Sequence, residues 1–147
     1  MNIRFVKRTD IDELIILCQA HATYEKVAFD IKNKATLLAK YLFDEKAGIH
    51  CLVVEKNNVL VGYSTYVIQF STWDVEYYTY IDCLYLKEEI RGHGIGKKVM
   101  NHIRQHALQE GCSTVQWQTP NFNTNAIRFY KNLGAISKSK ERFYWTF

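Results

Sequence analysis

The sequence is poor in the features that divide a chain into parts or carry it to a membrane. Pro120 is the only proline among 147 residues, and neither a low-complexity run nor an internal repeat separates one part from another. No apolar run approaches the roughly 20 residues of a membrane-spanning helix, and the opening residues MNIRFVKRTD lack the apolar core of a signal peptide. We therefore expect one domain over residues 1–147, located in the cytoplasm, with a core of ordinary size and no membrane partner.

Cysteine and charge are present without the patterns that give them a special role. The four cysteines lie far apart and form no CxxC pair, which predicts free thiols in a reducing compartment. The net charge of +4 is modest and forms no basic stripe interleaved with exposed aromatic residues, so we expect no nucleic-acid partner. His102 and His106 have a spacing that can bind metal, but no glutamate lies between them and no third ligand lies nearby, so no metal site is expected.

The pattern of apolar residues predicts a mixed α/β (α+β) fold. Strand patterns occupy residues 2–8, 49–56, 59–70, 75–86, 113–119 and 141–147, and helical spacing occupies residues 10–24, 34–43, 94–109 and 123–135. The pair Asn57–Asn58 between two strand patterns is typical of a hairpin turn, and Gly111 is positioned to end a helix. The resulting order, βα(α)βββαβαβ, has an antiparallel first half and a βαβ unit behind it.

Three of the seven glycines lie at alternate positions in EEIRGHGIGKKVMNHI, between a predicted strand and a predicted helix. The first amides of a helix lack internal partners, and the macrodipole gives that end partial positive charge. Glycines at positions 92, 94 and 96 let the chain turn tightly and let a ligand approach these amides. The stretch therefore predicts a site for an anion, in particular a phosphate, although it fits neither GxxxxGK[ST] nor GxGxxG. Taken alone, a turn that only starts a helix remains the alternative.

Two motifs together resemble the hallmarks of the GNAT acetyltransferase superfamily. RGHGIG matches its pyrophosphate loop, Arg/Gln-x-x-Gly-x-Gly/Ala, and NTNAIRFYKNLGA resembles its second motif, Asn-x-x-Ala-x-x-x-Tyr-x-x-x-Gly. They lie in the order and separation expected of that superfamily, among strands and helices that agree with it. The resemblance implies a mostly antiparallel central sheet with helices on both faces, and acetyl-CoA as the donor of the transferred group.

The resemblance also implies which residues contact acetyl-CoA. Its pyrophosphate would lie against the glycine stretch, at Arg91, Gly92, His93, Gly94, Ile95, Gly96 and Lys97. Its pantetheine amides would pair with the strand end Leu84–Tyr85–Leu86, as an added strand does. Asn123 and Ala126 of the second motif would contact the cofactor arm, and Tyr130 would lie near the sulfur.

Further stretches narrow the resemblance to the spermidine/spermine (diamine) acetyltransferases. TYEK near residue 24, STW before the central strand, IDCLYLKEEIRGHGIG and AIRFYKNLGA run in the same order as related stretches of that group. An acid on the strand before the glycine stretch faces the substrate amine in that group, and Asp82 occupies this position. Tyr24 and Glu25 match a Tyr-Glu pair that contacts substrate. A second acid of the group is replaced by Cys83, which weakens the expectation of a polyamine substrate but not of acetyl transfer.

These residues suit the transfer of an acetyl group to an amine. A free alkylamine is mostly protonated near pH 7 but attacks a thioester only when neutral, so the site must hold a cation, remove a proton and protonate the leaving thiolate. Asp82 is the candidate base, directly or through water, and Glu25 is a second carboxylate that attracts the ammonium. Tyr130 is the candidate acid, and Trp117 is a candidate wall of the acceptor pocket.

The sequence leaves the acceptor and the assembly open. The preferred prediction is a small cationic amine, and the alternatives are a protein N-terminus, a lysine side chain, an aminoglycoside or an amino-acid amine. A module that binds acyl-CoA without catalysis is the competing class, and the presence of both Asp82 and Tyr130 favours the enzyme. The aromatic final segment RFYWTF is compatible with a homodimer.

Overall fold

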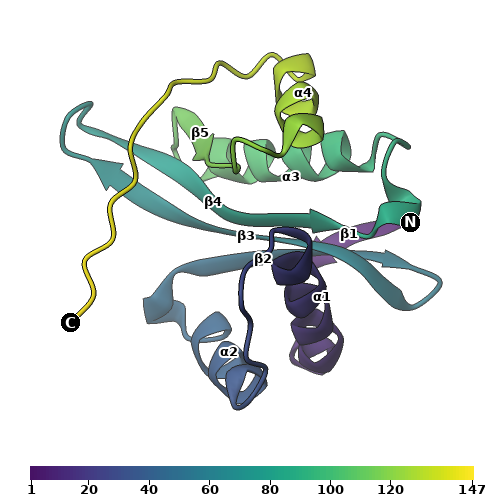
Figure 1. Cartoon of the computed structure of the whole chain (residues 1–147). Coiled ribbons are helices and arrows are strands. Elements are labelled where there is room, and N and C mark those ends of the chain that lie inside the picture. Colours follow the sequence, from purple (N-terminus) through teal and green to yellow (C-terminus); the bar gives the residue numbers. More distant parts are fainter.

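The computed structural model describes residues 1–147 and contains one five-stranded sheet (Figure 1). Its strands follow one another across the sheet in chain order, as β1 (Asn2–Phe5), β2 (Ile49–Lys56), β3 (Val59–Ser71), β4 (Glu76–Leu86) and β5 (Thr114–Trp117). The first four strands pair antiparallel, and β5 pairs parallel to β4. This confirms the predicted mixed, mostly antiparallel sheet, in which the only parallel neighbours are joined through a helix.

Helices cover both faces of the sheet, as predicted (Figure 1). α1 (Ile11–Tyr24) and α2 (Lys34–Leu42) lie on one face and α3 (Ile95–Gln109) and α4 (Thr124–Asn132) on the other, with 3₁₀ turns η1 (Arg8–Asp10), η2 (Glu45–Ala47) and η3 (Glu88–Ile90). Each face has its own buried cluster. Val53 of β2 belongs to the cluster under α1, and its neighbour Val54 belongs to the cluster under α3, because successive side chains of a strand point to opposite faces. None of the helices combines the length and the apolar character that a membrane crossing requires.

Local signals in the sequence account for several element boundaries. Asn57 and Asn58 have φ values of 52° and 61°, the left-handed pair typical of a tight hairpin turn, and they join β2 to β3. α3 buries one residue per turn, at Ile95, Val99, Ile103 and Ala107. Just beyond α3, Gly111 has a φ of +75°, the conformation that commonly ends a helix. The predicted turn and helix end are therefore confirmed.

One predicted strand is wrong. Residues 141–147 form no strand, and the chain after α4 continues as an irregular segment to the C-terminus (Figure 1). Its backbone takes part in no hydrogen-bonded ladder, and Phe143 and Trp145 are 90% and 88% exposed. A β-branched and aromatic pattern forms a strand only where an edge is available to pair with, and local sequence does not carry that information. The homodimer inferred from this segment stays a prediction.

A β-bulge places Asp82 at the point where β4 leaves β5. Thr65 of β3 pairs with Cys83, and the next residue of β3 pairs with Ile81, so Asp82 is the extra residue on β4. The parallel ladder with β5 also ends at Ile81. From Asp82 to Leu86, therefore, this edge of β4 has no strand beside it. A carboxylate lies where an open sheet edge begins.

A charged cluster holds the start of α1 against the first two strands. Asp10 lies at the N-terminus of α1, and its carboxylate accepts hydrogen bonds of 2.7 and 3.0 Å from Arg4 and one of 2.7 Å from the Lys7 amide. Arg4 also donates to Glu55 of β2 at 2.8 Å. The hydrogen bonds from Arg4 hold the pKa of Asp10 below its usual value. The cluster sets the position of the helix whose other end carries the predicted acceptor residues.

Asp10→Asn should lower the free energy of unfolding at pH 7 by about 1–3 kcal/mol, because a largely buried carboxylate loses its charge-assisted hydrogen bonds. A group whose folded pKa is depressed stabilises the fold above its unfolded pKa, and this contribution is lost as the pH falls through the folded value. Urea unfolding should thus give the full difference between wild type and variant at pH 7 and a shrinking difference below the usual aspartate range. Asp12→Asn, at an exposed neighbouring position, should change little. Equal losses in both variants would contradict the role of the cluster.

Candidate active site

The glycine stretch forms a loop of free amides in front of α3. Gly92 and Gly94 have φ values of +79° and +74°, and a Cβ added at either position would meet no atom within 4 Å. None of the amides of residues 92–97 donates a hydrogen bond within the protein, and Lys98 is the first to bond back, to the Gly94 carbonyl at 3.2 Å. The side chains of His93 and Lys97 are exposed. The loop therefore offers the donors, the helix dipole and the access that a phosphate group needs.

Two residues of this stretch have contacts that the sequence did not predict. A Cβ at Gly96 would lie 2.9 Å from Cζ of Phe129, so this glycine lets α4 pack closely against α3. The Arg91 side chain turns back toward β4, where its Nε donates to the Leu86 carbonyl at 2.8 Å. Its guanidinium carbon lies 4.4 Å from the centre of the Tyr24 ring. Arg91 thus joins the loop, the end of β4 and the end of α1.

The open edge of β4 leads directly into the loop. Leu84 and Leu86 pack into the core under α3, whereas Tyr85 packs on the α1 side. Because β5 ends its pairing at Ile81, no strand pairs with this side of the segment, where only the Leu86 carbonyl is bound, by Arg91. An extended ligand can add to such an edge by main-chain hydrogen bonds.

The second motif lies on α4 and reaches across to α1. Asn123 caps α4, and its Oδ1 accepts a hydrogen bond from the Ala126 amide at 3.2 Å. The same oxygen accepts from the Tyr24 hydroxyl at 3.4 Å, between residues 99 positions apart. The predicted cofactor side and the predicted acceptor side therefore meet at this contact.

Tyr130 offers a protonated phenol beside these elements. Its ring centre lies 5.0 Å from that of Trp117, and its hydroxyl makes no hydrogen bond within the protein and is not sealed from solvent. Burial raises the pKa of Tyr130 to about 12, and the charge of Glu25 adds to the rise. The phenol therefore keeps its proton near neutral pH. Trp117 packs against Tyr130 and against the core under α3, and its place in the acceptor pocket stays a prediction.

Asp82 and Glu25 lie on the α1 side of the sheet. Asp82 accepts a long hydrogen bond of 3.6 Å from the Cys83 thiol, and Cys83 packs in the cluster under α1. Burial raises the pKa of the Cys83 thiol to about 12, so this side chain is neutral. The charges of Glu25 and Asp82 both act on His21 of α1. The site thus presents two carboxylates and one neutral thiol to the space between α1 and β4.

Two residues that the sequence analysis did not identify, His21 and Tyr63, also lie on this side of the site. His21 lies one turn before Glu25, with Nε2 at 3.3 Å from Glu25 Oε1 and Nδ1 at 2.9 Å from the Tyr63 hydroxyl. Its ring stacks on Tyr85, with 5.2 Å between the ring centres. Burial lowers the pKa of His21, so the imidazole is neutral at pH 7. The i,i+4 spacing to Glu25 was a visible signal, but the contact with Tyr63 joins residues 42 positions apart and has no local signal.

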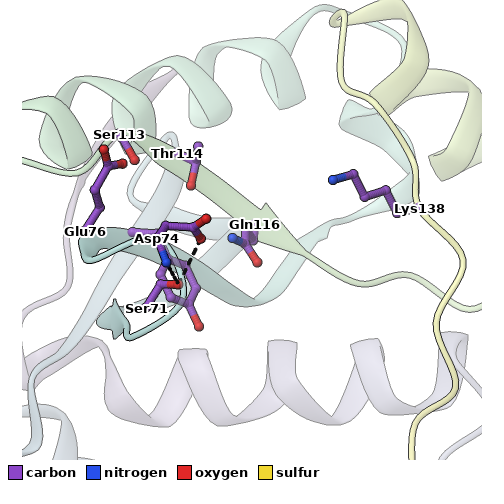
Figure 2. Close-up of a pocket in the computed structure, with 8 residues that line it drawn as sticks. Ser71, Asp74, Glu76, Ser113, Thr114, Gln116 and Lys138 are labelled. Carbon is purple, nitrogen blue, oxygen red and sulfur yellow. Dashed lines mark hydrogen bonds between the residues drawn. The ribbon is translucent and has the colours of Figure 1, made fainter.

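A separate polar groove lies across β4 and β5 near the β3–β4 turn (Figure 2). It is lined by Ser71, Asp74, Glu76, Tyr78, Ser113, Thr114, Gln116 and Lys138. Its visible hydrogen bonds are those of the β3–β4 turn, where the Ser71 hydroxyl donates to Asp74 at 2.9 Å. None of the predicted site residues lines this groove. The candidate active site is therefore the region between the glycine loop, β4, α1 and α4.

This arrangement suits group transfer between an extended phosphate-bearing donor and a cationic acceptor. The loop can hold a phosphate, and the β4 edge can hold the chain behind it. Asp82 and Glu25 can attract a cation and accept a proton, and Tyr130 can give a proton to a leaving group.

Comparison with known proteins gives a consistent result. The family model described as "Acetyltransferase (GNAT) family" matches residues 14–135. The thialysine N-epsilon-acetyltransferase of Sus scrofa is 33% identical over 141 residues, which cover 90% of this chain and 82% of that protein. The spermidine/spermine N(1)-acetyltransferase-like protein 1 of Homo sapiens is 23% identical and is matched by 99% of this chain over 22% of its own length.

Solved structures agree on the fold. An aminoglycoside acetyltransferase from an uncultured soil metagenomic sample superposes with a TM-score of 0.85 at 22% identity, covering 99% of this chain and 95% of that one. A possible acetyltransferase from Clostridium difficile 630 superposes with a TM-score of 0.84 at 20% identity, covering 99% and 97% of the two chains. Identity at this level supports the fold alone, whereas the family model and the 33% identical relative support the activity. The chain therefore belongs to the GNAT family of acetyltransferases and is an N-acetyltransferase.

Proposed function

We propose that this N-acetyltransferase takes an acetyl group from acetyl-CoA and transfers it directly to a small cationic amine while both substrates are bound. The observation that carries the proposal is the position of Asp82. It lies at the bulge where the open edge of β4 begins, and its charge acts on the pKa of His21 near the end of α1. A carboxylate at this place lies between the proposed path of the donor and the proposed acceptor surface.

The residues present fit a donor of this shape. Acetyl-CoA supplies the acetyl group as a thioester. The free amides of residues 92–97 would hold its pyrophosphate, and the unpaired edge Leu84–Leu86 would hold its pantetheine amides. Asn123 would contact the same arm from α4. A backbone amide near Leu84 would donate to the thioester oxygen and stabilise the charge that develops there.

The acceptor nitrogen would approach from the α1 side. Asp82 attracts the ammonium group and, directly or through one water, removes the proton that blocks attack. The neutral nitrogen then forms a bond to the thioester carbon. Holding the two substrates side by side contributes much of the rate, because attack becomes effectively unimolecular.

Tyr130 would complete the reaction at the leaving group. The bond between the acyl carbon and the sulfur breaks, and the phenol gives its proton to the departing thiolate, while the new amide nitrogen loses its surplus proton through solvent, which returns a proton to the phenol. Its unpaired hydroxyl and raised pKa keep a proton available there.

The acceptor class follows from charge. Asp82 would meet the reacting nitrogen, and Glu25, on α1, would meet a second positive group further along the acceptor. This favours a diamine, a polyamine or a lysine-like amine, in keeping with the relatives named for thialysine and for spermidine/spermine. Cys83 is a half-buried neutral thiol where the resembled group has a second acid, so we expect a looser preference for polyamines.

Gly94→Ala should weaken acetyl-CoA binding about 10- to 100-fold, the loss of a charge-assisted hydrogen bond or more, because the added methyl group obstructs the loop amides. Alanine is also strained at this positive φ, so a matched control is needed. Gly111→Ala is that control, since Gly111 lies at the other end of α3 with a φ of +75° and equally open surroundings, so that alanine is strained there in the same way. Calorimetric titration of both variants with acetyl-CoA should show the loss only for Gly94→Ala. Similar affinities in the two variants would rule out the loop as the pyrophosphate site.

Tyr130→Phe should lower kcat by about 10²–10⁴-fold, the usual contribution of a general acid, with little change in acetyl-CoA affinity. The ring still packs against Trp117, and only the hydroxyl is lost. Steady-state kinetics and calorimetric titration measure the two quantities separately. Wild-type turnover at every pH would remove Tyr130 from the mechanism.

Glu25→Gln should raise the KM for a diamine about fivefold, the loss of one partly exposed ion pair, and barely change the KM for a monoamine of equal length. Asp82→Asn should instead lower kcat for both acceptors, most severely at low pH, where the neutral amine is scarcest. A panel of diamines and monoamines, with the released thiol as readout, tests both variants. If neutral or anionic acceptors are better substrates than diamines, the cationic-acceptor proposal fails and the acetyltransferase activity stands.

A further inference from the structure

We infer that His21 is a positioning residue, which orients the Glu25 carboxylate toward the acceptor and, when it gains a proton, removes the preference of the site for a second positive charge. The inference rests on the proposed function, because Glu25 is the carboxylate proposed to meet that charge. Neither sequence motif includes His21.

The first step is the geometry around the imidazole. Nδ1 lies 2.9 Å from the Tyr63 hydroxyl, and Nε2 lies 3.3 Å from Glu25 Oε1. Burial strongly raises the pKa of Tyr63, so its phenol keeps its hydrogen and can donate it to Nδ1. The neutral imidazole then carries its proton on Nε2, the nitrogen that lies 3.3 Å from the Glu25 carboxylate. Tyr63 thereby selects the tautomer that holds the carboxylate.

The second step is that the imidazole cannot easily move. Its side chain is 12% exposed, against 31% for Glu25. Its ring is stacked on Tyr85 from β4 and lies edge-on to Tyr63 from β3. A rigid donor one helical turn before Glu25 restricts the rotamers of that longer side chain, so the carboxylate is held in one direction at low entropic cost to binding.

The third step is the balance of charges around His21. The titratable and charged groups that face it are Glu25 of α1, Tyr63 of β3, Asp82 and Tyr85 of β4, and Arg91 of the loop, and the thiols of Cys18 and Cys83 lie next to Tyr63. Glu25 and Asp82 favour the imidazolium, while burial and Arg91 oppose it. Burial prevails, so the pKa of His21 lies below its usual value, and the imidazole is neutral at pH 7 and gains its proton only in acid.

Protonation then changes what the acceptor meets. An imidazolium beside Glu25 forms an ion pair that neutralises the carboxylate. A second ammonium group on the acceptor meets this pair instead of a free negative charge, whereas the reacting nitrogen still meets Asp82. Acidification should therefore weaken diamines more than monoamines, beyond the loss of neutral amine that affects both.

The test is the ratio of the KM for 1,4-diaminobutane to the KM for butylamine, measured from pH 8 to pH 5.5 with acetyl-CoA saturating. Taking the ratio cancels the shared effects of Asp82 and of amine protonation. In the wild type the ratio should rise about fivefold in acid, the loss of one partly exposed ion pair. His21→Gln keeps an N–H donor for Glu25 but cannot titrate, so its ratio should stay at the wild-type alkaline value throughout. His21→Leu, which removes the donor, should show the raised ratio at every pH.

Two further measurements keep the outcomes distinct. Thermal melts and acetyl-CoA titrations of each variant check that fold and donor site are intact. Glu25→Gln, at a partly exposed helix end, should abolish the pH dependence of the ratio even if the His21 variants fold poorly. A wild-type ratio independent of pH, or a His21→Gln ratio that still rises in acid, overturns the inference while leaving the diamine preference in place. Absence of any diamine preference at pH 8 overturns the proposed acceptor and this inference with it.

Discussion

The separation of β4 from β5 is the constraint on which the rest of the site depends. The two parallel strands pair only as far as Ile81, and the bulge on the other side of β4 inserts Asp82 at the next position. An ordinary ladder would satisfy this edge with another strand. Here no strand covers the edge, the Leu86 carbonyl accepts from Arg91, and the segment leads into the loop before α3, so that the open edge and the carboxylate follow from one interruption of the sheet.

The side chains on the two faces of β4 have different roles in the site. Leu84 and Leu86 pack under α3 and hold the strand in the core, while Cys83 and Tyr85 face α1. The α1 side is therefore aromatic and polar, and partial burial there makes each charge matter more than it would in water. Burial keeps His21 neutral on this side, and the charge of Arg91 acts in the same sense, whereas Tyr130 on α4 is kept protonated by burial on the other side of the sheet.

Contacts between distant segments fix the position of the proposed donor side relative to the proposed acceptor side. Arg91 reaches from the loop to the Leu86 carbonyl and the Tyr24 ring, and Tyr24 in turn donates to Asn123 at the start of α4. At its far end α1 is held by the Arg4–Asp10 pair. A shift of α1 would therefore move Tyr24 and Glu25 away from β4 and α4 together. A polar group placed by a helix anchored at both ends is more precise than one placed on a loop.

Much of the fold and part of the site could be predicted from the sequence, because the signals are local. The Asn57–Asn58 turn, the apolar stripe of α3 and the glycine at its end each depend on residues within a few positions. The glycine stretch predicted free amides for the same reason, since free amides at a helix start are a property of that start. The strand predicted at residues 141–147 failed because pairing needs an edge elsewhere in the molecule.

The sequence by itself determined the order of the elements as far as α4, the free amides of the loop before α3, and the presence of two acids and a phenol that acyl transfer can use. Only the tertiary structure decided how these groups combine. It made Gly96 a packing position against Phe129, placed Trp117 behind Tyr130, and set His21 between Tyr63 and Glu25. The physical reason is that propensity and capping act over one helical turn, whereas burial, tautomer and ion pairing depend on neighbours that the chain brings together from far apart.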